Sequence, residues 1–284
     1  MEFSENIIPA SNVDMYQVHG DHIDSVMDTQ AFQRHFQEMI SQSVLRERVS
    51  TEVMLRNDGL YETDILSLHY GKDDFGFSSI ILVHPERKNL LVVASYPVYL
   101  HKKMMVRVEK VWVWDNLLEA TIECSIRGEF TFSFIATDYF AHKDDYLPGK
   151  EIEIRVGAMG MQVREPKVKE IALDGQPALA IMSHLGQNVE YDENGQVKPL
   201  KISTEQLVYF NPSDEKCPDE ASFQAPAGDI RERRFLGIDF YETDILICRR
   251  SFDVSIPLIF KKEMYPDARK DMPLSGVLWI AGSF

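Results

Sequence analysis

The run Tyr61-Glu62-Thr63-Asp64-Ile65-Leu66 recurs without a change as Tyr241-Glu242-Thr243-Asp244-Ile245-Leu246. Each copy follows an apolar residue, Leu60 or Phe240, and a second, shorter apolar run comes after it. An internal repeat of this kind is typical of one structural unit that is used more than once. The pattern therefore predicts a β-hairpin unit in which both copies occupy equivalent strands. The repeated hexapeptide does not by itself indicate a chemical activity.

Strand patterns follow one another from Glu52 onward. The segments 79–83 and 90–95 flank a polar turn, as the two strands of a hairpin do. Glu129–Ile135 alternates between phenylalanines and small polar residues, so a half-buried strand must turn one set inward. Because burying aromatic rings is strongly favoured, we expect Phe130, Phe132 and Phe134 to be core. Met105–Trp114 alternates in the same way, and its expected face consists of Val106, Val108, Lys110, Trp112 and Trp114.

A looser similarity relates the segments 108–158 and 230–282. Each contains three strand patterns, a polar stretch and a closing strand that begins at a glycine, Gly149 or Gly276. Three antiparallel strands, a crossover and a closing strand resemble the oligonucleotide/oligosaccharide-binding (OB) barrel, although a β-sandwich gives a similar pattern. We therefore predict a mainly-β protein with two OB-like or small β-barrel modules and an N-terminal helix.

The domain boundaries follow from changes in residue composition along the chain. Asp24–Arg48 contains no proline or glycine and has apolar residues near helical spacing, with Asp28 as a candidate N-cap. The segment 164–229 is rich in proline and acidic residues, with short strands expected at 178–183 and 206–210. The predicted units are an arm and helix (1–50), a first β module (51–163), a connecting segment or partner-facing surface (164–229) and a second β module (230–284).

The bulk composition narrows the classes of function. The chain has 284 residues, with 45 acidic against 30 basic residues and a formal net charge of −15. Such a surface repels phosphate backbones and anionic lipids, so we expect no nucleic-acid and no membrane partner. Cys124, Cys217 and Cys248 lack CxxC spacing, and the start of the chain lacks a signal-peptide pattern. Both features favour a cytoplasmic location.

Several motifs resemble stretches of uncharacterised bacterial proteins with two OB-like β modules. They are Ala136-Thr137-Asp138-Tyr139-Phe140 with Lys143 and Tyr146-Leu147-Pro148-Gly149, then Phe223-Gln224-Ala225-Pro226, then Ser275-Gly276-Val277-Leu278-Trp279-Ile280-Ala281-Gly282. The resemblance covers roughly the C-terminal two thirds of the chain. It implies a bacterial origin and a two-module β architecture, and it carries no activity and no functional residue.

Metal chemistry has one candidate segment, in which His19, Asp21, His22 and Asp24 lie close together in sequence. Histidine and aspartate are common metal ligands, but this spacing needs further, distant ligands to complete a site. A polar arm ahead of the helix is the alternative interpretation. The carboxylate pairs Glu62/Asp64 and Glu242/Asp244 each share one strand face, which suits acid–base work or a divalent ion, but their repetition favours a structural role.

Ligand binding has one candidate surface, on the predicted strand 105–114. Trp112 and Trp114 are able to stack on bases or sugars, with Arg107 and Lys110 as nearby cations. Aromatic residues on adjacent strands are more often core, so these four residues are weak candidates.

The function expected from these patterns is non-catalytic binding of a protein partner, in the manner of an immunity or inhibitor protein. A surface this acidic is suited to a basic partner. We expect no catalytic residues and no cofactor. The alternatives are OB-type binding of single-stranded nucleic acid or oligosaccharide, and a metal-dependent hydrolase. The sequence leaves the oligomeric state open.

Overall fold

The computed structural model describes residues 22–55, 59–72, 74–84, 86, 89–184, 186, 188–212 and 219–284, together with the backbone of 7–9. Its strands and helices follow in the order β1 (Ile7–Pro9), α2 (Thr29–Gln42), β2 (Val44–Leu55), β3 (Gly59–Lys72), β4 (Phe75–Val83), β5 (Leu90–Tyr99), β6 (Lys102–Val113), β7 (Ala120–Ile126), β8 (Phe130–Ala136), α3 (Tyr139–His142), β9 (Glu151–Arg164), β10 (Glu170–Leu173), α4 (Gly175–His184), β11 (Leu200–Ser203), β12 (Tyr209–Pro212), β13 (Glu220–Pro226), β14 (Arg231–Phe235), β15 (Ile238–Arg249), β16 (Asp253–Lys261), η2 (Lys262–Met264) and β17 (Pro273–Ser283).

Strands make up 58% of the structure and helices 13%, which confirms the mainly-β prediction. The two copies of the repeated hexapeptide lie in β3 and β15, each the middle strand of an antiparallel meander. The same positions of the two copies face inward: Thr63 and Ile65 are buried in one, Thr243 and Ile245 in the other. The prediction of equivalent hairpin strands is confirmed, although the two copies belong to different sheets.

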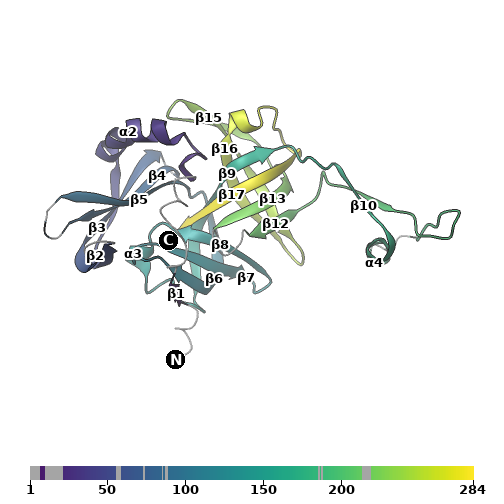
Figure 1. Cartoon of the computed structure of the whole chain (residues 1–284), viewed down its shortest axis with the longest axis horizontal. Coiled ribbons are helices and arrows are strands. Elements are labelled where there is room, and N and C mark those ends of the chain that lie inside the picture. Colours follow the sequence, from purple (N-terminus) through teal and green to yellow (C-terminus); the bar gives the residue numbers. More distant parts are fainter. Residues whose placement is uncertain are drawn as a thin grey trace.

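The first of these sheets contains β2, β3, β4 and β5 in sequence order (Figure 1). Helix α2 covers part of its outer face, where the Phe32 and Phe77 ring centroids lie 5.1 Å apart. Asp28 is the N-cap, as predicted, because its carboxylate accepts a hydrogen bond from the Ala31 N–H. The expected helix end at Arg48 is wrong. The helix ends at Gln42 and the chain enters β2, where pairing with β3 satisfies the backbone groups of the following residues.

The second sheet closes on itself. Strands β6, β7 and β8 form an antiparallel meander, β9 returns antiparallel to β6, and β17 lies between β8 and β9. The result is a closed five-stranded barrel in which the short helix α3 forms part of the crossover from β8 to β9. Three meander strands, a crossover and closing strands are the arrangement that the OB-like prediction describes, and the small barrel is confirmed.

Strands β9 and β17 also belong to a second ring. Strand β16 pairs with β9, β15 with β16, and β13 with β17. Ala227, directly after β13, forms a bridge with Ile245 of β15 and so completes this ring. Strand pairing therefore crosses the predicted boundaries at residues 163 and 230. The division of the chain into the predicted units stays a prediction.

A β-bulge corrects the face predicted for β6. The register against β7 shifts between Val108 and Lys110, so that Glu109 is the extra residue. Because a bulge inverts the alternation beyond it, Val111 joins Val106 and Val108 in the barrel core. Lys110 and Trp112 are therefore on the other side, contrary to the expected single face.

The predicted phenylalanine face is core. Phe132 and Phe134 are 1% and 0% exposed, and Phe130 is 9% exposed. All three belong to a cluster that fills both rings. A second cluster lies between the four-stranded sheet, α2 and the outside of the first barrel, with Trp279 of β17 in it. Cys124 and Cys248 are buried with free thiols, and Cys217 lies outside the described residues.

Residues 165–208 form an arm that extends away from the two sheets (Figure 1). The arm contains the β10–β11 ladder, in which Glu170 is paired with Ser203, and the helix α4. The short strand expected at 178–183 is wrong, because these residues lie in α4. The strand expected at 206–210 is displaced to Tyr209–Pro212. None of the described helices is long and apolar enough to cross a membrane.

Candidate functional site

A polar cleft lies between the inner face of the four-stranded sheet and the first barrel. Its volume is about 160 Å³. The sheet contributes side chains from β2, β3 and β4, and the barrel contributes the end of β8, β9 and the end of β17. The lining residues are Arg46, Glu47, Ser67, His69, Asp74, Ser78, Val98, Leu100, Thr137, Asp138, Arg155, Ser283 and Phe284.

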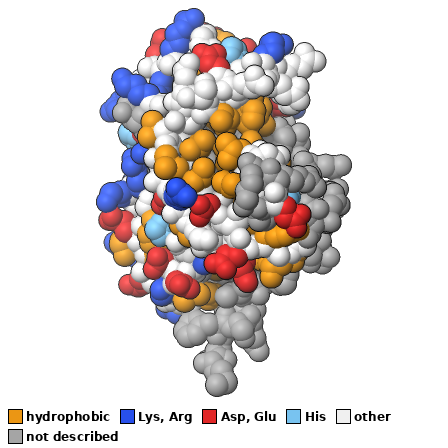
Figure 2. Space-filling view, turned by 90° about the vertical axis from the view of Figure 1, so that its left-hand side faces the viewer, with side chains coloured by type: hydrophobic (Ala, Val, Ile, Leu, Met, Phe, Trp, Pro, Cys, Tyr) orange, Lys and Arg blue, Asp and Glu red, His pale blue; other side chains and the backbone are white. Residues whose placement is uncertain are grey.

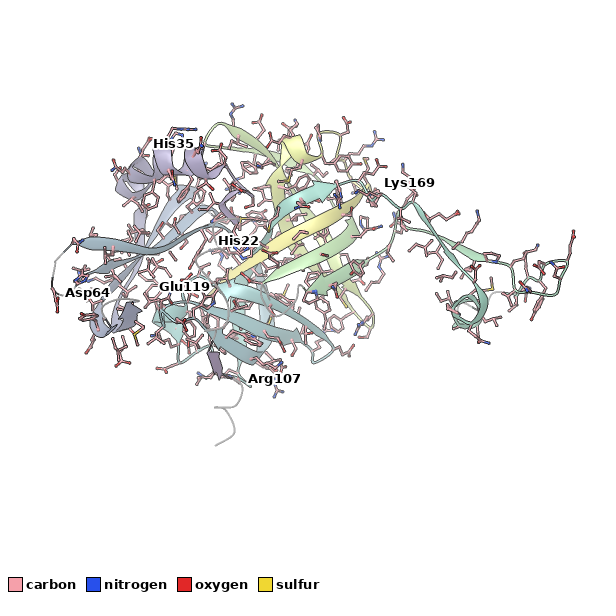
Figure 3. All side chains as sticks on the ribbon, viewed as in Figure 1. His22, His35, Asp64, Arg107, Glu119 and Lys169 are labelled. Atoms are coloured by element: carbon pink, nitrogen blue, oxygen red, sulfur yellow. The ribbon has the colours of Figure 1, made fainter. Side chains whose placement is uncertain are left out.

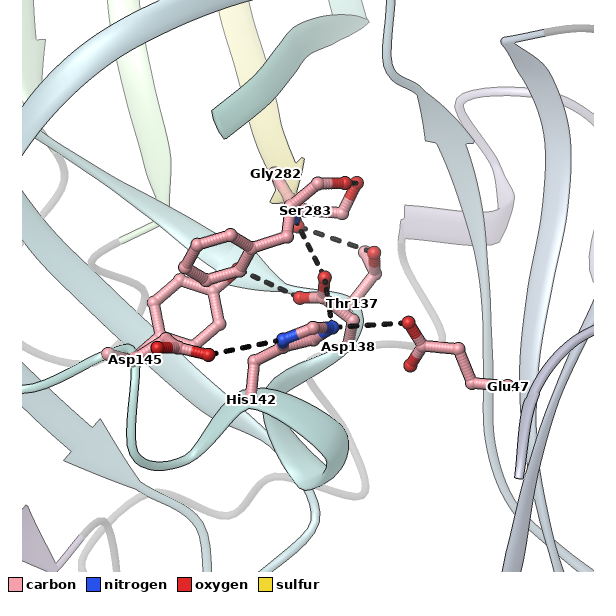
Figure 4. A network of polar contacts seen from close by, with 9 residues as sticks. Glu47, Thr137, Asp138, His142, Asp145, Gly282 and Ser283 are labelled. Atoms are coloured by element: carbon pink, nitrogen blue, oxygen red, sulfur yellow. Dashed lines mark hydrogen bonds and ion pairs between the residues drawn. The ribbon is translucent and has the colours of Figure 1, made fainter. Parts of the chain in front are cut away.

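Two carboxylates and an imidazole meet at one edge of this cleft (Figure 4). Glu47 lies on β2, Asp138 is the N-cap position of α3, and His142 is the last residue of α3. The His142 Nε2 atom lies 3.2 Å from Glu47 Oε1 and 3.9 Å from Asp138 Oδ2. One oxygen or nitrogen atom from each residue lies within 4.8 Å of the other two.

Neighbouring groups hold this cluster in place. The Tyr146 hydroxyl donates to Asp138 Oδ1 at 2.8 Å, and the Phe284 backbone N–H donates to Asp138 Oδ2 at 2.8 Å. On the other side of the imidazole, His142 Nδ1 lies 3.4 Å from Asp145 Oδ2. The Phe284 ring stacks on the imidazole, with 4.8 Å between centroids. The orientations of Asp138 and His142 are therefore each fixed by at least one further contact.

The cluster has perturbed protonation equilibria. Burial raises the pKa of Asp138 to about 6, against the opposing effect of the hydrogen bonds from Phe284 and Tyr146. Burial of His142 acts to lower its pKa, but the carboxylates of Asp138 and Glu47 outweigh this effect, so the pKa is raised. An imidazole beside a carboxyl group whose pKa is about 6 is able to exchange a proton with it. The same atoms are also suitable ligands for a divalent cation.

His69 lines the cleft from β3 and is 8% exposed. Its Nε2 atom is buried and has no hydrogen-bond partner. Burial, with a smaller effect of the Arg46 charge, lowers the pKa of His69 to about 4, although Asp74 opposes the shift. The imidazole is therefore neutral at pH 7, and one of its nitrogen atoms is unsatisfied.

Asp74, also in the cleft wall, is part of an ion-pair network that joins the two sheets. Arg233 Nη1 lies 2.9 Å from Asp74 Oδ1 and 2.6 Å from Glu242 Oε1. His101 also contacts the Asp74 carboxylate. Burial acts to raise the pKa of Asp74, but His101 and Arg233 outweigh this effect and lower it. Glu242 belongs to the repeated hexapeptide, and its carboxylate has a structural role here.

The outer face of the four-stranded sheet carries an apolar patch, which Figure 2 shows from the side of this sheet. Helix α2 contacts the Phe77 end of β4, and exposed apolar side chains lie toward the other end of the sheet. Strand register places Leu66 beside Ile81, Ile81 beside Val92, and Val83 beside Leu90. The patch, defined as Leu66, Val83, Leu90 and Val92, includes two strongly exposed side chains: Leu90 is 61% exposed and Val92 43%.

The structure places the described members of the predicted metal segment apart. His22 is buried, stacks on Trp279 with 4.3 Å between centroids and contacts Glu220 Oε1 at 2.9 Å. Asp24 is exposed. His19 and Asp21 lie outside the described residues, so a metal site formed by all four stays a prediction.

The predicted ligand-binding residues of the first barrel do not form one surface. Trp114 is 5% exposed and packs in the cluster between barrel and sheet. Trp112 is half-buried, and Lys110 Nζ lies 3.4 Å from Glu123 Oε1. Arg107 is exposed at the edge of the barrel, far from the labelled His22 in the interior (Figure 3). The burial of Trp114 leaves Trp112 as the one aromatic side chain of this set that is partly exposed near the two cations.

Sequence reasoning missed the cluster of Glu47, Asp138 and His142. A partial signal was present, because Asp138, His142 and Asp145 follow one another at spacings of four and three, which a helical turn brings to one side. Nothing in the sequence connects them with Glu47, which lies more than ninety residues away and was expected in a helix.

Comparisons of the chain with protein-family models, with curated proteins and with solved structures find no match. The resemblance to bacterial two-module proteins therefore stays a prediction.

Proposed function

We propose that the protein is a non-catalytic binding protein whose apolar patch docks a protein partner with a basic surface. The observation that carries this proposal is the exposure of the apolar side chains of Leu90 and Val92 on the outer face of the sheet. Contiguous exposed apolar surface rimmed by polar residues is typical of protein interaction sites. Leu66 and Val83, both half-buried, continue the patch toward the middle of the sheet.

Two acidic side chains on the same face of the sheet favour a basic partner. Glu52 and Glu62 lie directly opposite each other on β2 and β3, and both are exposed. Like charges at directly opposed positions destabilise a sheet. A lysine or arginine from a partner offsets this repulsion. The net charge of −15 adds long-range attraction for the same class of partner.

An inhibitor or immunity protein of the bacterial cytoplasm is the concrete form of this proposal. Such a protein neutralises a basic effector by covering its surface, and it needs no catalytic group of its own. The OB-type ligand-binding alternative is less well supported, because Trp114 is buried and Lys110 is paired with Glu123.

The test requires a partner that binds through this patch. Proteins captured on the full chain are purified, and each is titrated against the parent, Leu90→Asp and the matched control Val168→Asp. Val168 is an apolar arm residue that is 57% exposed, similar to Leu90. We expect Leu90→Asp to weaken binding of the true partner by at least about 30-fold in the dissociation constant, which corresponds to about 2 kcal/mol. Val168→Asp is expected to have no effect.

The charge contribution has its own readout. Removing both like charges with Glu52→Gln and Glu62→Gln is expected to slow association and reduce its salt dependence. If every partner binds Leu90→Asp as tightly as the parent, the apolar patch is not the docking surface. Loss of binding on Val168→Asp alone assigns the interaction to the arm instead.

A further inference from the structure

We propose that Glu47, Asp138 and His142 bind one divalent transition-metal cation, of the zinc type, at the edge of the cleft. This site lies on the inner side of the sheet and is independent of the proposed docking patch. Ligands of a zinc ion at about 2.1 Å lie roughly 3–3.5 Å apart. The separations of 3.2 Å and 3.9 Å from His142 Nε2 to the two carboxylates are close to this geometry.

The surroundings of the imidazole match those of a metal ligand. Histidines that bind metals commonly donate their other ring N–H to a carboxylate, which fixes the tautomer and the orientation of the ring. Asp145 Oδ2 lies 3.4 Å from His142 Nδ1 and so occupies this position. The tautomer with a proton on Nδ1 leaves the Nε2 lone pair directed at Glu47 and Asp138. The Tyr146 hydroxyl, which donates to Asp138 Oδ1, orients the second ligand.

A separate observation points to a ligand in the same cleft. The Oε2 atom of Glu47 is buried and has no hydrogen-bond partner, and the same holds for Nε2 of His69. Leaving a buried polar atom unsatisfied costs free energy, and the rule applies most strongly to a charged carboxylate. His69 is 8% exposed. It lines the same cleft as Glu47 and Asp138. A cation between the two carboxylates satisfies Glu47, and a water bound to that cation within the cleft is available to donate to His69.

The donor set indicates which metals fit. One imidazole and two carboxylates suit zinc, cobalt or manganese, whereas calcium and magnesium prefer oxygen ligands throughout. Three protein ligands beside an open cleft leave at least one coordination position for water or a small ligand. Since Glu47 comes from the four-stranded sheet and the other two ligands from the barrel, the cation also joins the two layers.

The experiment is a calorimetric titration of the chelator-treated full chain with zinc chloride, repeated with magnesium chloride. We expect one equivalent of zinc to bind, and magnesium to bind at least about 100-fold more weakly. Glu47→Gln and His142→Gln each remove a ligand and are expected to weaken zinc binding by more than about 100-fold. Asp145→Asn leaves the three ligands in place and is expected to weaken it about 10- to 100-fold.

The matched control is His35→Gln on α2. His35 is exposed, and its Nδ1 lies 3.8 Å from Glu38 Oε2, so it offers an ordinary surface histidine–carboxylate pair. This variant is expected to bind zinc as the parent does. A zinc isotherm that is unchanged in both Glu47→Gln and His142→Gln overturns the proposal, and so does the absence of stoichiometric binding to the parent.

A second measurement keeps the test independent of whether the variants fold. The ¹⁵N resonances of the histidine rings in the unmodified protein report directly which nitrogen binds the metal. We expect one equivalent of zinc to shift Nε2 of His142 and to leave His35 unchanged. If the His142 resonances do not respond while zinc binds, the cation is elsewhere and the site is wrong.

Discussion

At the scale of single residues, burial decides which charges the cleft holds at neutral pH. His69 and Asp138 are both buried in the same cleft, and both are shifted toward their neutral forms. The shifts have opposite directions because the neutral form of histidine is the deprotonated one and that of aspartic acid is the protonated one. The N-cap role of Asp28 could be predicted from the sequence because an N-cap depends only on the next few residues.

The His69 shift predicts how stability changes with pH. The pKa of His69 in the folded protein is about 4, below its ordinary value of 6.5, so the unfolded chain binds more protons between these values. The stabilisation is fully present above pH 6.5 and is lost as the pH falls toward 4. For His69→Asn we expect the loss of stability between pH 7 and pH 5 to be smaller by about 2 kcal/mol than for the parent.

Urea unfolding of the two proteins at both pH values measures this difference. The exposed His35→Asn variant is the control, and it is expected to follow the parent. The carboxylates of the cleft titrate in all three proteins and cancel in the comparison. Equal pH dependence of His69→Asn and the parent would show that the His69 imidazole is not held neutral by burial.

At the scale of elements, the sequence predicts what local alternation controls. Strands β3, β8 and β15 follow period-two patterns, and the buried phenylalanine face of β8 is the one expected. Prediction fails where a tertiary contact overrides the local pattern. The residues after Gln42 have helical spacing but pair with β3, and the bulge at Glu109 inverts the face of β6 without any signal such as a glycine or proline.

The arm is an element whose removal we expect to leave the rest of the fold intact. Its first and last ladder residues, Glu170 and Ser203, are direct partners, so a short linker spans the gap between their neighbours. Its buried side chains, Ala178 and Met182, belong to neither of the two main hydrophobic clusters. Replacing residues 170–203 with four glycine and serine residues is expected to change the unfolding free energy by less than about 1 kcal/mol.

Chemical denaturation of the shortened protein beside the parent is the measurement. Thr204 is kept in both, because it donates to the Val168 carbonyl oxygen and accepts a hydrogen bond from Gln224, which closes the base of the arm. A loss of several kcal/mol would mean that the arm packs on the body of the protein. Partner binding by the shortened protein also separates the apolar patch from the arm as docking surfaces.

At the scale of the whole molecule, the closed barrel and the second ring of strands share two strands. Strand β9 pairs with β6 in the first ring and β16 in the second, while β17 pairs with β8 in the first and β13 in the second. The similarity of segments 108–158 and 230–282 is visible in the sequence, since both are a meander followed by a closing strand. The sharing of β9 and β17 between the two rings is not visible in the sequence, because the residue pattern of a strand does not specify which strands it pairs with.

Because the first barrel needs β17, we predict that the first β module does not fold alone. A fragment of residues 1–163 lacks β17, so β8 and β9 lose the strand that joins them and the first barrel stays open. It also loses Trp279, which is 0% exposed and packs between barrel and sheet. Removing a core strand costs more than the 5–15 kcal/mol by which domains are usually stable. We therefore expect the fragment to show no cooperative urea transition in near-ultraviolet circular dichroism.

The complementary fragment 164–284 provides the decisive comparison. Mixing the two fragments during refolding restores β17 to its position between β8 and β9, and we expect the transition of the full chain to return. The full chain itself is expected to unfold in one step, because neither ring is complete without strands from both halves. If 1–163 unfolds cooperatively alone, the predicted boundary at residue 163 separates autonomous units, and β17 adds to a barrel that is already stable.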